Sequence, residues 1–104
     1  MLTDFVWKAL ADPTRRAIIE ELSTRKKTTA ELCGRFESLS RFAVMKHLDV
    51  LEEAGLVQAS REGRNRWNTL NLEPLAAADE WLARHVERRR DMLQRIKRLA
   101  KEEN

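Results

Sequence analysis

Residues 40–57 read SRFAVMKHLDVLEEAGLV, and their pattern predicts one helix with two unlike faces. Ser40 is a residue type that caps helix starts, and Gly55 supplies the left-handed conformation at which helices commonly end. Apolar spacing assigns to the buried face Val44, His47, Leu48 and Leu51. The opposite face carries Phe42, Met45, Lys46 and Asp49. Because this second face mixes large apolar groups with a cation, it is available to a ligand.

A shorter helix is predicted just before this stretch. Thr28 and Thr29 are cap residues, and the spacing of one buried face follows at Thr29, Leu32, Cys33 and Phe36. Gly34 weakens this helix, because glycine loses more backbone freedom in a helix than any other residue. The segment Glu37–Leu39 then connects it to Ser40. The two helices are therefore joined by a tight turn.

Two more helices are predicted at the start of the chain. The first covers Asp4–Leu10, where apolar residues recur at helical spacing. Asp12 is an N-cap and Pro13 stands at the first helical position, where its missing N–H is harmless. The second helix is therefore expected to run from Pro13 to about Ser23. The cationic run Arg25–Lys27 that follows it is expected to be solvated.

The pattern changes after Gly55. Residues 56–61 and 66–70 predict two short strands on either side of a hairpin tip at residues 62–65. A long helix is predicted for residues 74–98, and at 1.5 Å per residue it would span about 37 Å. This length exceeds the diameter of so small a domain, so part of the helix needs a partner.

Composition limits the class of protein. The chain has 104 residues, which fits one domain over residues 1–104, mainly α-helical with a small β-hairpin. With 3 glycines and 2 prolines, it lacks the turn residues of an all-β fold. The balance of 20 basic and 17 acidic residues gives a net charge of +3, which permits a polyanionic partner. Two histidines, no tyrosine and no phosphate-binding loop leave no catalytic machinery, so no enzyme is expected.

Cysteine usage and hydropathy bear on location. One cysteine cannot form an intrachain disulfide, which fits a reducing compartment. No run approaches the roughly 18 apolar residues of a membrane span, and the first residues lack the features of a signal peptide. We therefore expect a cytoplasmic protein without a membrane segment.

The order of elements indicates a winged helix-turn-helix that binds double-stranded DNA. A major groove about 12 Å wide admits one α-helix, while the preceding helix lies against the DNA backbone. The hairpin would form the wing, and its arginines would enter the adjacent minor groove or contact phosphate. The candidate DNA-binding residues are Ser40, Arg41, Phe42, Met45, Lys46, Arg61, Arg64 and Arg66. The competing interpretation is that these cations are ordinary solvated side chains.

Three blocks of sequence strengthen this interpretation. Residues 6–16, VWKALADPTRR, residues 44–57, VMKHLDVLEEAGLV, and residues 61–64, REGR, resemble ArsR-type winged-helix transcriptional repressors. The resemblance covers roughly residues 4–75 and implies a homodimer, joined through the first and last helices, that releases a palindromic operator when an effector arrives. The candidate dimer contacts are Phe5, Trp7, Trp81, Leu82, Val86, Leu93 and Ile96. The effector, the operator and the regulated genes do not follow from the sequence.

Many members of that family sense metals, and this chain departs from them at the metal ligands. The third-helix metal box appears here as Glu31-Leu32-Cys33-Gly34-Arg35-Phe36, with a cation at the second thiolate position. The alternative site in the last helix is reduced to Asp79-Glu80-Trp81 and one histidine, His85. A zinc ion needs three or four ligands, so neither a metal site nor another cofactor is expected.

Several alternatives remain open. A winged-helix module that has lost DNA binding would instead use exposed Phe42 and Met45 to bind protein. Cys33 beside Arg35 would suit a thiol-responsive regulator, whereas its place on an apolar face favours a small core residue. The basic run Arg88–Arg90 fits a solvated helix end or a contact with flanking DNA.

Overall fold

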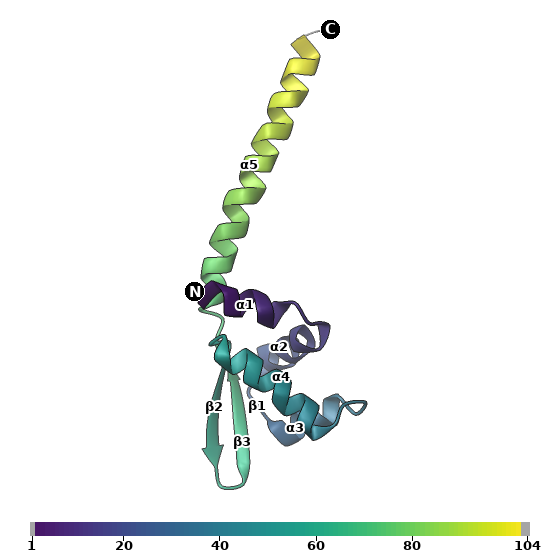
Figure 1. Cartoon of the computed structure of the whole chain (residues 1–104), viewed down its shortest axis with the longest axis vertical. Coiled ribbons are helices and arrows are strands. Elements are labelled where there is room, and N and C mark those ends of the chain that lie inside the picture. The colour runs from purple at the N-terminus through teal and green to yellow at the C-terminus, as the bar shows by residue number, and fades with distance from the viewer. Residues whose placement is uncertain (1, 103–104) are drawn as a thin grey trace.

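The computed structural model describes the backbone of residues 2–102 and the side chains of residues 4–102; Met1, Glu103 and Asn104 lie outside it. In chain order, the elements are α1 (Leu2–Leu10), α2 (Pro13–Thr24), β1 (Lys27–Thr28), α3 (Thr29–Arg35), α4 (Arg41–Glu53), β2 (Val57–Glu62), β3 (Asn65–Leu70) and α5 (Leu75–Glu102). The first four helices form a compact body, from which the hairpin projects at one end and α5 at the other (Figure 1). The molecule measures 71 × 28 × 22 Å. The predicted fold class is confirmed, and α5 continues to Glu102 instead of ending near Arg98.

The predicted starts of α2 and α4 are confirmed by their caps, whereas α1 begins at Leu2, two residues earlier than predicted. The Asp12 carboxylate accepts a hydrogen bond from the backbone N–H of Arg15 at 3.0 Å, with Pro13 following it in the first turn of α2. The Ser40 hydroxyl accepts one from the backbone N–H of Ala43 at 3.1 Å at the start of α4. These bonds satisfy backbone donors that have no partner inside the helix.

Glu31 completes a capping box at the start of α3. Its backbone N–H donates to the Thr28 hydroxyl at 3.1 Å, and its carboxylate accepts from the Thr28 backbone N–H at 3.2 Å. The Arg25 guanidinium donates to the same carboxylate. The hydrogen bond from Arg25, followed by that from the Thr28 backbone, lowers the pKa of Glu31 to about 2. Glu31 therefore remains ionised in the folded protein at pH values where it would be protonated in the unfolded chain.

We expect the stabilisation by Glu31 to disappear in acid. A carboxyl group whose pKa is lowered on folding stabilises the folded state at neutral pH. This contribution is lost as the pH falls from about 4.3, the value for the unfolded chain, towards about 2. Urea unfolding of the wild type and Glu31→Gln should therefore differ most at pH 6 and converge by about pH 2. A difference that stays constant over this range would contradict the assignment.

The core lies where α1, α2, α3 and α4 meet the base of the hairpin. The apolar side chains that are buried together are Ala9, Ile18, Leu22, Leu32, Val44, Leu48, Leu51, Ala54, Leu56 and Val57. Three of them, Val44, Leu48 and Leu51, form the predicted inner face of α4. The prediction of a buried face from apolar spacing is therefore confirmed for α4.

The hairpin belongs to a three-stranded antiparallel sheet in the order β1-β3-β2. Its strands pair as far as Glu62 and Asn65, so the tip is shorter than predicted. Gly63 turns the chain there with a φ of 62°, a conformation that glycine adopts without steric cost. The two-residue strand β1 pairs Thr28 with Trp67 and was not predicted, because two residues show no periodicity.

Lys27 corrects the expectation of a solvated cationic run. Arg25 and Lys26 are exposed, but the residue Lys27 is only 3% exposed. Its ammonium group donates to the backbone carbonyl of Glu21 at 2.5 Å and to the Thr24 hydroxyl at 2.9 Å. The Glu21 carboxylate lies 3.5 Å away. Pairing of β1 with β3 draws Lys27 inward, where it binds the carboxyl end of α2.

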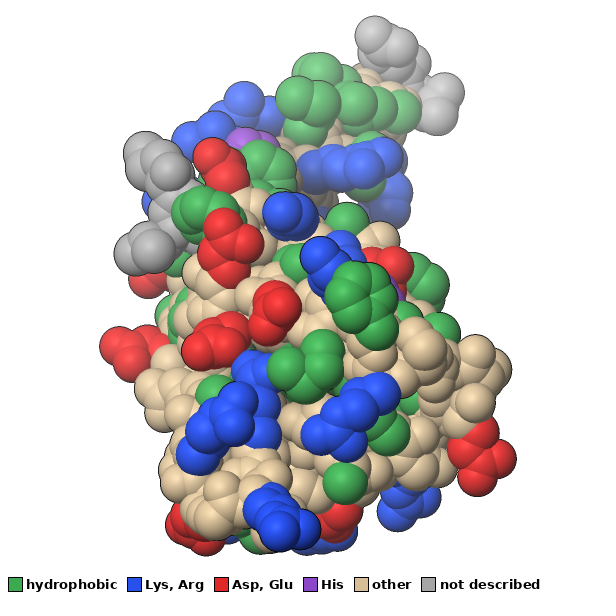
Figure 2. All heavy atoms as spheres, turned by 60° about the horizontal axis from the view of Figure 1, so that its bottom comes forward, with side chains coloured by type: hydrophobic (Ala, Val, Ile, Leu, Met, Phe, Trp, Pro, Cys, Tyr) green, Lys and Arg blue, Asp and Glu red, His purple; other side chains and the backbone are tan. Residues whose placement is uncertain are grey.

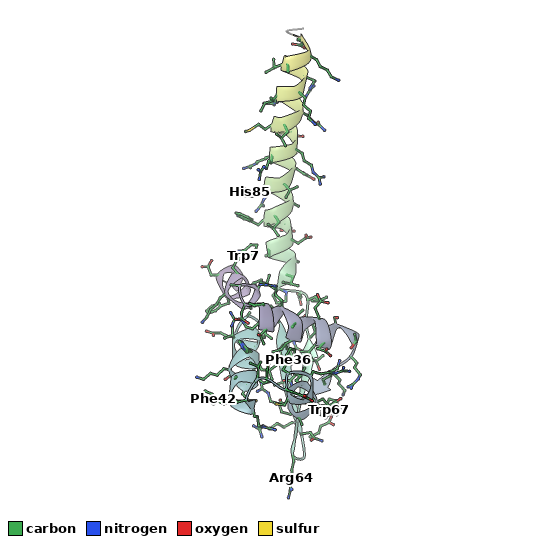
Figure 3. The ribbon with its side chains drawn as sticks, turned by 90° about the vertical axis from the view of Figure 1, so that its right-hand side faces the viewer. Trp7, Phe36, Phe42, Arg64, Trp67 and His85 are labelled. Atoms are coloured by element: carbon green, nitrogen blue, oxygen red, sulfur yellow. The ribbon has the colours of Figure 1, made fainter. Side chains whose placement is uncertain are left out.

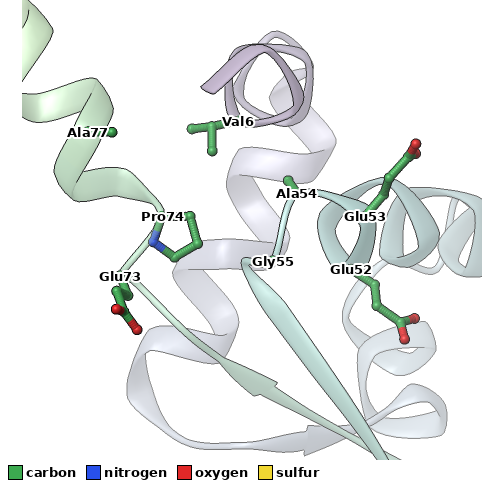
Figure 4. Close-up of a pocket in the computed structure, with 8 residues that line it drawn as sticks. All are labelled: Val6, Glu52, Glu53, Ala54, Gly55, Glu73, Pro74 and Ala77. Atoms are coloured by element: carbon green, nitrogen blue, oxygen red, sulfur yellow. The ribbon is translucent and has the colours of Figure 1, made fainter. Parts of the chain in front are cut away.

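The joint between the body and α5 is narrow. A hollow of about 330 Å³ lies between α1, the end of α4 and the start of α5, lined by Val6, Glu52, Glu53, Ala54, Gly55, Glu73, Pro74 and Ala77. Val6, Pro74 and Ala77 face this hollow, whereas the carboxylate of Glu73 points away from it (Figure 4). Gly55 has a φ of 76°, and a Cβ atom there would lie 3.3 Å from Pro74 Cγ. Glycine therefore takes the positive φ at the end of α4 without strain, and any larger residue would also crowd Pro74.

Candidate nucleic-acid interface

The amino-terminal half of α4 presents the predicted recognition surface. Ser40, Arg41, Phe42 and Lys46 are all exposed, and Phe42 is 70% exposed. The Lys46 ammonium lies over the Phe42 ring, 5.2 Å from its centroid. Capping by Ser40 fixes the direction in which the helix starts, so these side chains stand on a rigid element.

The wing contributes two further exposed cations. Arg64 lies at the tip of the hairpin and points away from the body (Figure 3). Arg61 is exposed on β2, opposite Arg66 of β3 in the strand register. Cations on a projecting hairpin suit contact with phosphate groups beside the groove that a helix occupies.

Arg66 does not project from the tip as predicted. It lies within β3, and its side chain is only 11% exposed. Its guanidinium forms an ion pair with Glu52 at 2.9 Å, lies 4.0 Å from Asp49 and contacts the sulfur of Met45 at 3.4 Å. Arg66 therefore fastens the hairpin to α4. Met45 is half-buried beneath this contact, whereas the sequence placed it on the outer face without a partner.

Charge is divided along α4. Arg41 and Lys46 are cationic in its first half, whereas Asp49, Glu52 and Glu53 follow in its second half. The end of the molecule with α4 and the hairpin shows Lys and Arg side chains interspersed with apolar ones (Figure 2). Phosphate groups are attracted to the first set of charges and repelled by the second. A DNA duplex would therefore approach the first half of α4 and the wing tip.

A polar cluster that the sequence did not reveal links α1, α2 and α4. Arg15 donates to the backbone carbonyls of Lys8 at 2.7 Å and Ala9 at 3.0 Å, and its guanidinium lies 3.4 Å from His47 Nδ1. His47 Nδ1 is 3.9 Å from the Asp12 carboxylate. The backbone N–H of Arg15, followed by the charges of His47 and Arg15, lowers the pKa of Asp12. His47 therefore joins α4 to the end of α1, in addition to lying beside the core.

The candidate dimer residues lie on α1 and α5. The rings of Trp7 and Trp81 meet edge to face with centroids 5.8 Å apart, and His85 stacks on Trp81 at 4.0 Å. Phe5 is 37% exposed on α1. Apolar side chains 44–63% exposed follow along α5 at Trp81, Leu82, Val86, Met92, Leu93, Ile96 and Leu99. Met92 and Leu99 were missed from the sequence, although they lie within the same stripe and Leu99 extends it towards the end of α5.

The surroundings of Cys33 agree with a core residue more than with a reactive thiol. Cys33 is half-buried and packs against the core cluster, and the neighbouring Arg35 side chain lies 3.6 Å from the Glu21 carboxylate. Within residues 4–102, no three His, Cys, Asp or Glu side chains are grouped so that they could hold a metal ion. None of the described helices is both long and apolar enough to cross a membrane.

Comparison with known proteins agrees with this geometry. Residues 10–58 match the helix-turn-helix domain family. The solved structure of an ArsR-like transcriptional regulator from Rhodococcus sp. RHA1 superposes with a TM-score of 0.82 and 30% identity, covering 96% of this chain and 91% of that one. This chain belongs to the ArsR family of winged helix-turn-helix transcriptional regulators. The ArsR match extends over α5, which the sequence blocks alone did not cover.

Two curated relatives of this ArsR-family regulator come from Bacillus subtilis (strain 168). The HTH-type transcriptional regulator YuzN is 45% identical over 78 residues, covering 69% of this chain and 85% of YuzN. The transcriptional repressor SdpR is 28% identical over 81 residues, covering 78% of this chain and 89% of SdpR. The chain is accordingly a transcriptional regulator with a helix-turn-helix DNA-binding domain, and these relatives are regulators, not enzymes.

Proposed function

We propose that this ArsR-family regulator is a homodimeric repressor that binds a palindromic operator in double-stranded DNA. The observation that carries the proposal is the exposed cationic start of α4 at the same end of the molecule as the wing tip. In this arrangement α4 enters the major groove, α3 lies against the backbone, and Arg64 reaches the neighbouring minor groove or its phosphates. The name of the relative SdpR, a transcriptional repressor, supports the direction of regulation.

The proposal of a homodimer rests on the apolar surface of α5. At about 100° per residue, the stripe from Trp81 to Leu99 spans an arc of about 140°, as wide as the buried face of a core helix. Such a surface is unfavourable in water, and a second copy of the same helix offers a matching surface. Two copies related by a two-fold axis would present two α4 helices, which fits a palindromic site with two half-sites.

Arg41 and Lys46 are expected to contribute differently to DNA binding. Arg41 is the first residue of α4, where its guanidinium can donate to guanine O6 and N7 together. Lys46 lies one turn further along as a flexible point charge that suits phosphate. Arg41→Ala should reduce the free energy of binding to a cognate duplex by about 1–3 kcal/mol, and it should reduce the free energy of binding to random DNA much less. Lys46→Ala should weaken binding to both kinds of DNA, and it should reduce by about one the slope of the logarithm of the binding constant against the logarithm of salt concentration.

The measurement is fluorescence anisotropy over a salt series with two duplexes. One carries the DNA upstream of the protein's own coding region, and the other has the same length and a scrambled sequence. Equal losses on both duplexes for Arg41→Ala would show that Arg41 does not read a base. If the wild type binds neither duplex, nor any duplex selected from a random pool, the proposed function is wrong. The exposed surface around Phe42 would then be better explained as a protein-binding site.

A further inference from the structure

Phe42 is the most exposed large apolar side chain among the described residues, at 70%. It stands in the first turn of α4, far from the aromatic pair at the base of α5, as the labelled positions of Phe42 and Trp7 show (Figure 3). It is therefore not part of the apolar stripe proposed for the dimer. A phenylalanine exposed on a rigid helix holds its apolar surface where a partner could bury it, and the groups around the ring indicate which kind of partner fits.

The surroundings of Phe42 favour a polyanion over an apolar protein surface. Lys46, four residues later on the same face, places its ammonium 5.2 Å from the ring centroid, and Arg41 precedes it. The contact with the cation limits the orientations of the ring. An apolar partner would have to desolvate these cations without compensation, whereas DNA neutralises them with phosphate. The Phe42 ring thus lies between two cations that can bind the phosphate groups bordering a DNA groove.

Within the major groove, one base-edge group matches a phenyl ring. The bases there expose hydrogen-bond donors and acceptors, and thymine adds a 5-methyl group. A phenyl ring has no hydrogen-bonding group with which to distinguish the polar edges, but it can bury a methyl group. We propose that Phe42 reads the 5-methyl group of a thymine, so each half-site carries a thymine next to the bases that Arg41 contacts. This inference rests on the proposed DNA binding and names the base that one further residue selects.

Replacing thymine by uracil tests the proposal, because it removes only the methyl group and leaves pairing and polar edges unchanged. A duplex is selected from a random pool with the full-length protein, and each thymine is replaced by uracil in turn. Burial of one methyl group corresponds to about a fourfold change in dissociation constant. At one thymine position that recurs in both half-sites, we expect each uracil to raise the dissociation constant of the wild type about fourfold. Phe42→Ala should bind the thymine and uracil duplexes with equal dissociation constants at that position.

Two controls separate this result from a general loss of binding. Arg41→Ala should weaken binding yet keep the thymine preference, because it leaves the Phe42 ring in place. Thermal unfolding should be unchanged in Phe42→Ala, because the side chain is exposed. The inference is overturned if the wild type binds the selected duplex but no uracil weakens binding, or if Phe42→Ala retains the same loss. If no duplex is selected at all, the proposed function fails, and the inference fails with it.

Discussion

Replacing Leu93 and Ile96 together by aspartate is expected to convert the protein into a monomer and to weaken operator binding by about 10²- to 10⁴-fold. The two side chains are 51% and 56% exposed in the isolated chain, so the body of the protein loses no core contact. In a dimer they would be buried against a second copy of α5, where four added carboxylates would be desolvated and would repel one another. Each monomer would then bind its half-site independently, without the high effective concentration that a dimer provides at the second half-site.

A matched variant separates the position of the charges from their number. Gln94→Asp with Arg98→Gln changes the net charge by the same amount, −2 per chain, on the side of α5 away from the apolar stripe. Sedimentation velocity should find this control dimeric and the Leu93/Ile96 variant monomeric, with both folded by circular dichroism. A monomeric wild type, or a Leu93/Ile96 variant that remains dimeric with full operator affinity, would refute the proposed interface.

The contact between Trp7 and Trp81 places α1 beside the start of the apolar stripe on α5. The edge-to-face pair joins α1 to the first turns of α5, so the position of α5 depends on α1. Arg15 in turn holds the last carbonyls of α1 and approaches His47 on α4. A continuous set of contacts therefore runs from the proposed dimer surface to the recognition helix.

Features set by neighbouring residues in the chain could be predicted from the sequence. The caps at Asp12 and Ser40, the end of α4 at Gly55 and the inner face of that helix depend on residues within one or two turns of each other. The order of elements then followed from helix and strand periodicity, since each pattern was long enough to read. The exposed first turn of α4 could be predicted for the same reason.

Features set by distant pairs could not be predicted. Lys27 is buried because β1 pairs with a strand about 40 residues later, as the contact between Lys27 and Asn68 shows. Arg66 lies against Glu52 because the hairpin folds back onto α4, whereas its position near a predicted tip suggested a free side chain. Arg66 finds its opposite charge 14 residues away, whereas Lys27 binds the nearby Glu21 only because the distant strand pairing turns it inward. Local charge patterns do not contain that information.

Leu48→Ala is expected to lower the free energy of unfolding by about 2–5 kcal/mol. Leu48 is fully buried on the inner face of α4, among Val44, Leu51 and side chains of the neighbouring helices. Its replacement removes apolar contacts and leaves a cavity that rigid neighbours fill only in part. A domain of this size has a total stability of about 5–15 kcal/mol, so a large share would be lost. Urea unfolding at one fixed protein concentration measures the effect, since the proposed dimerisation would make stability depend on concentration.

Phe42→Ala on the same helix is the control, and it should change the free energy of unfolding by no more than about 0.5 kcal/mol because its side chain is exposed. A loss below about 1 kcal/mol for Leu48→Ala, or an equal loss for both variants, would contradict the assignment of the two faces. The expected contrast assigns stability to the inner face of α4 and leaves its outer face available for the proposed base recognition. Since the cap at Ser40 and the core behind Leu48 hold the helix in place, substitutions on its outer face would, under the proposed function, change operator preference without unfolding the domain.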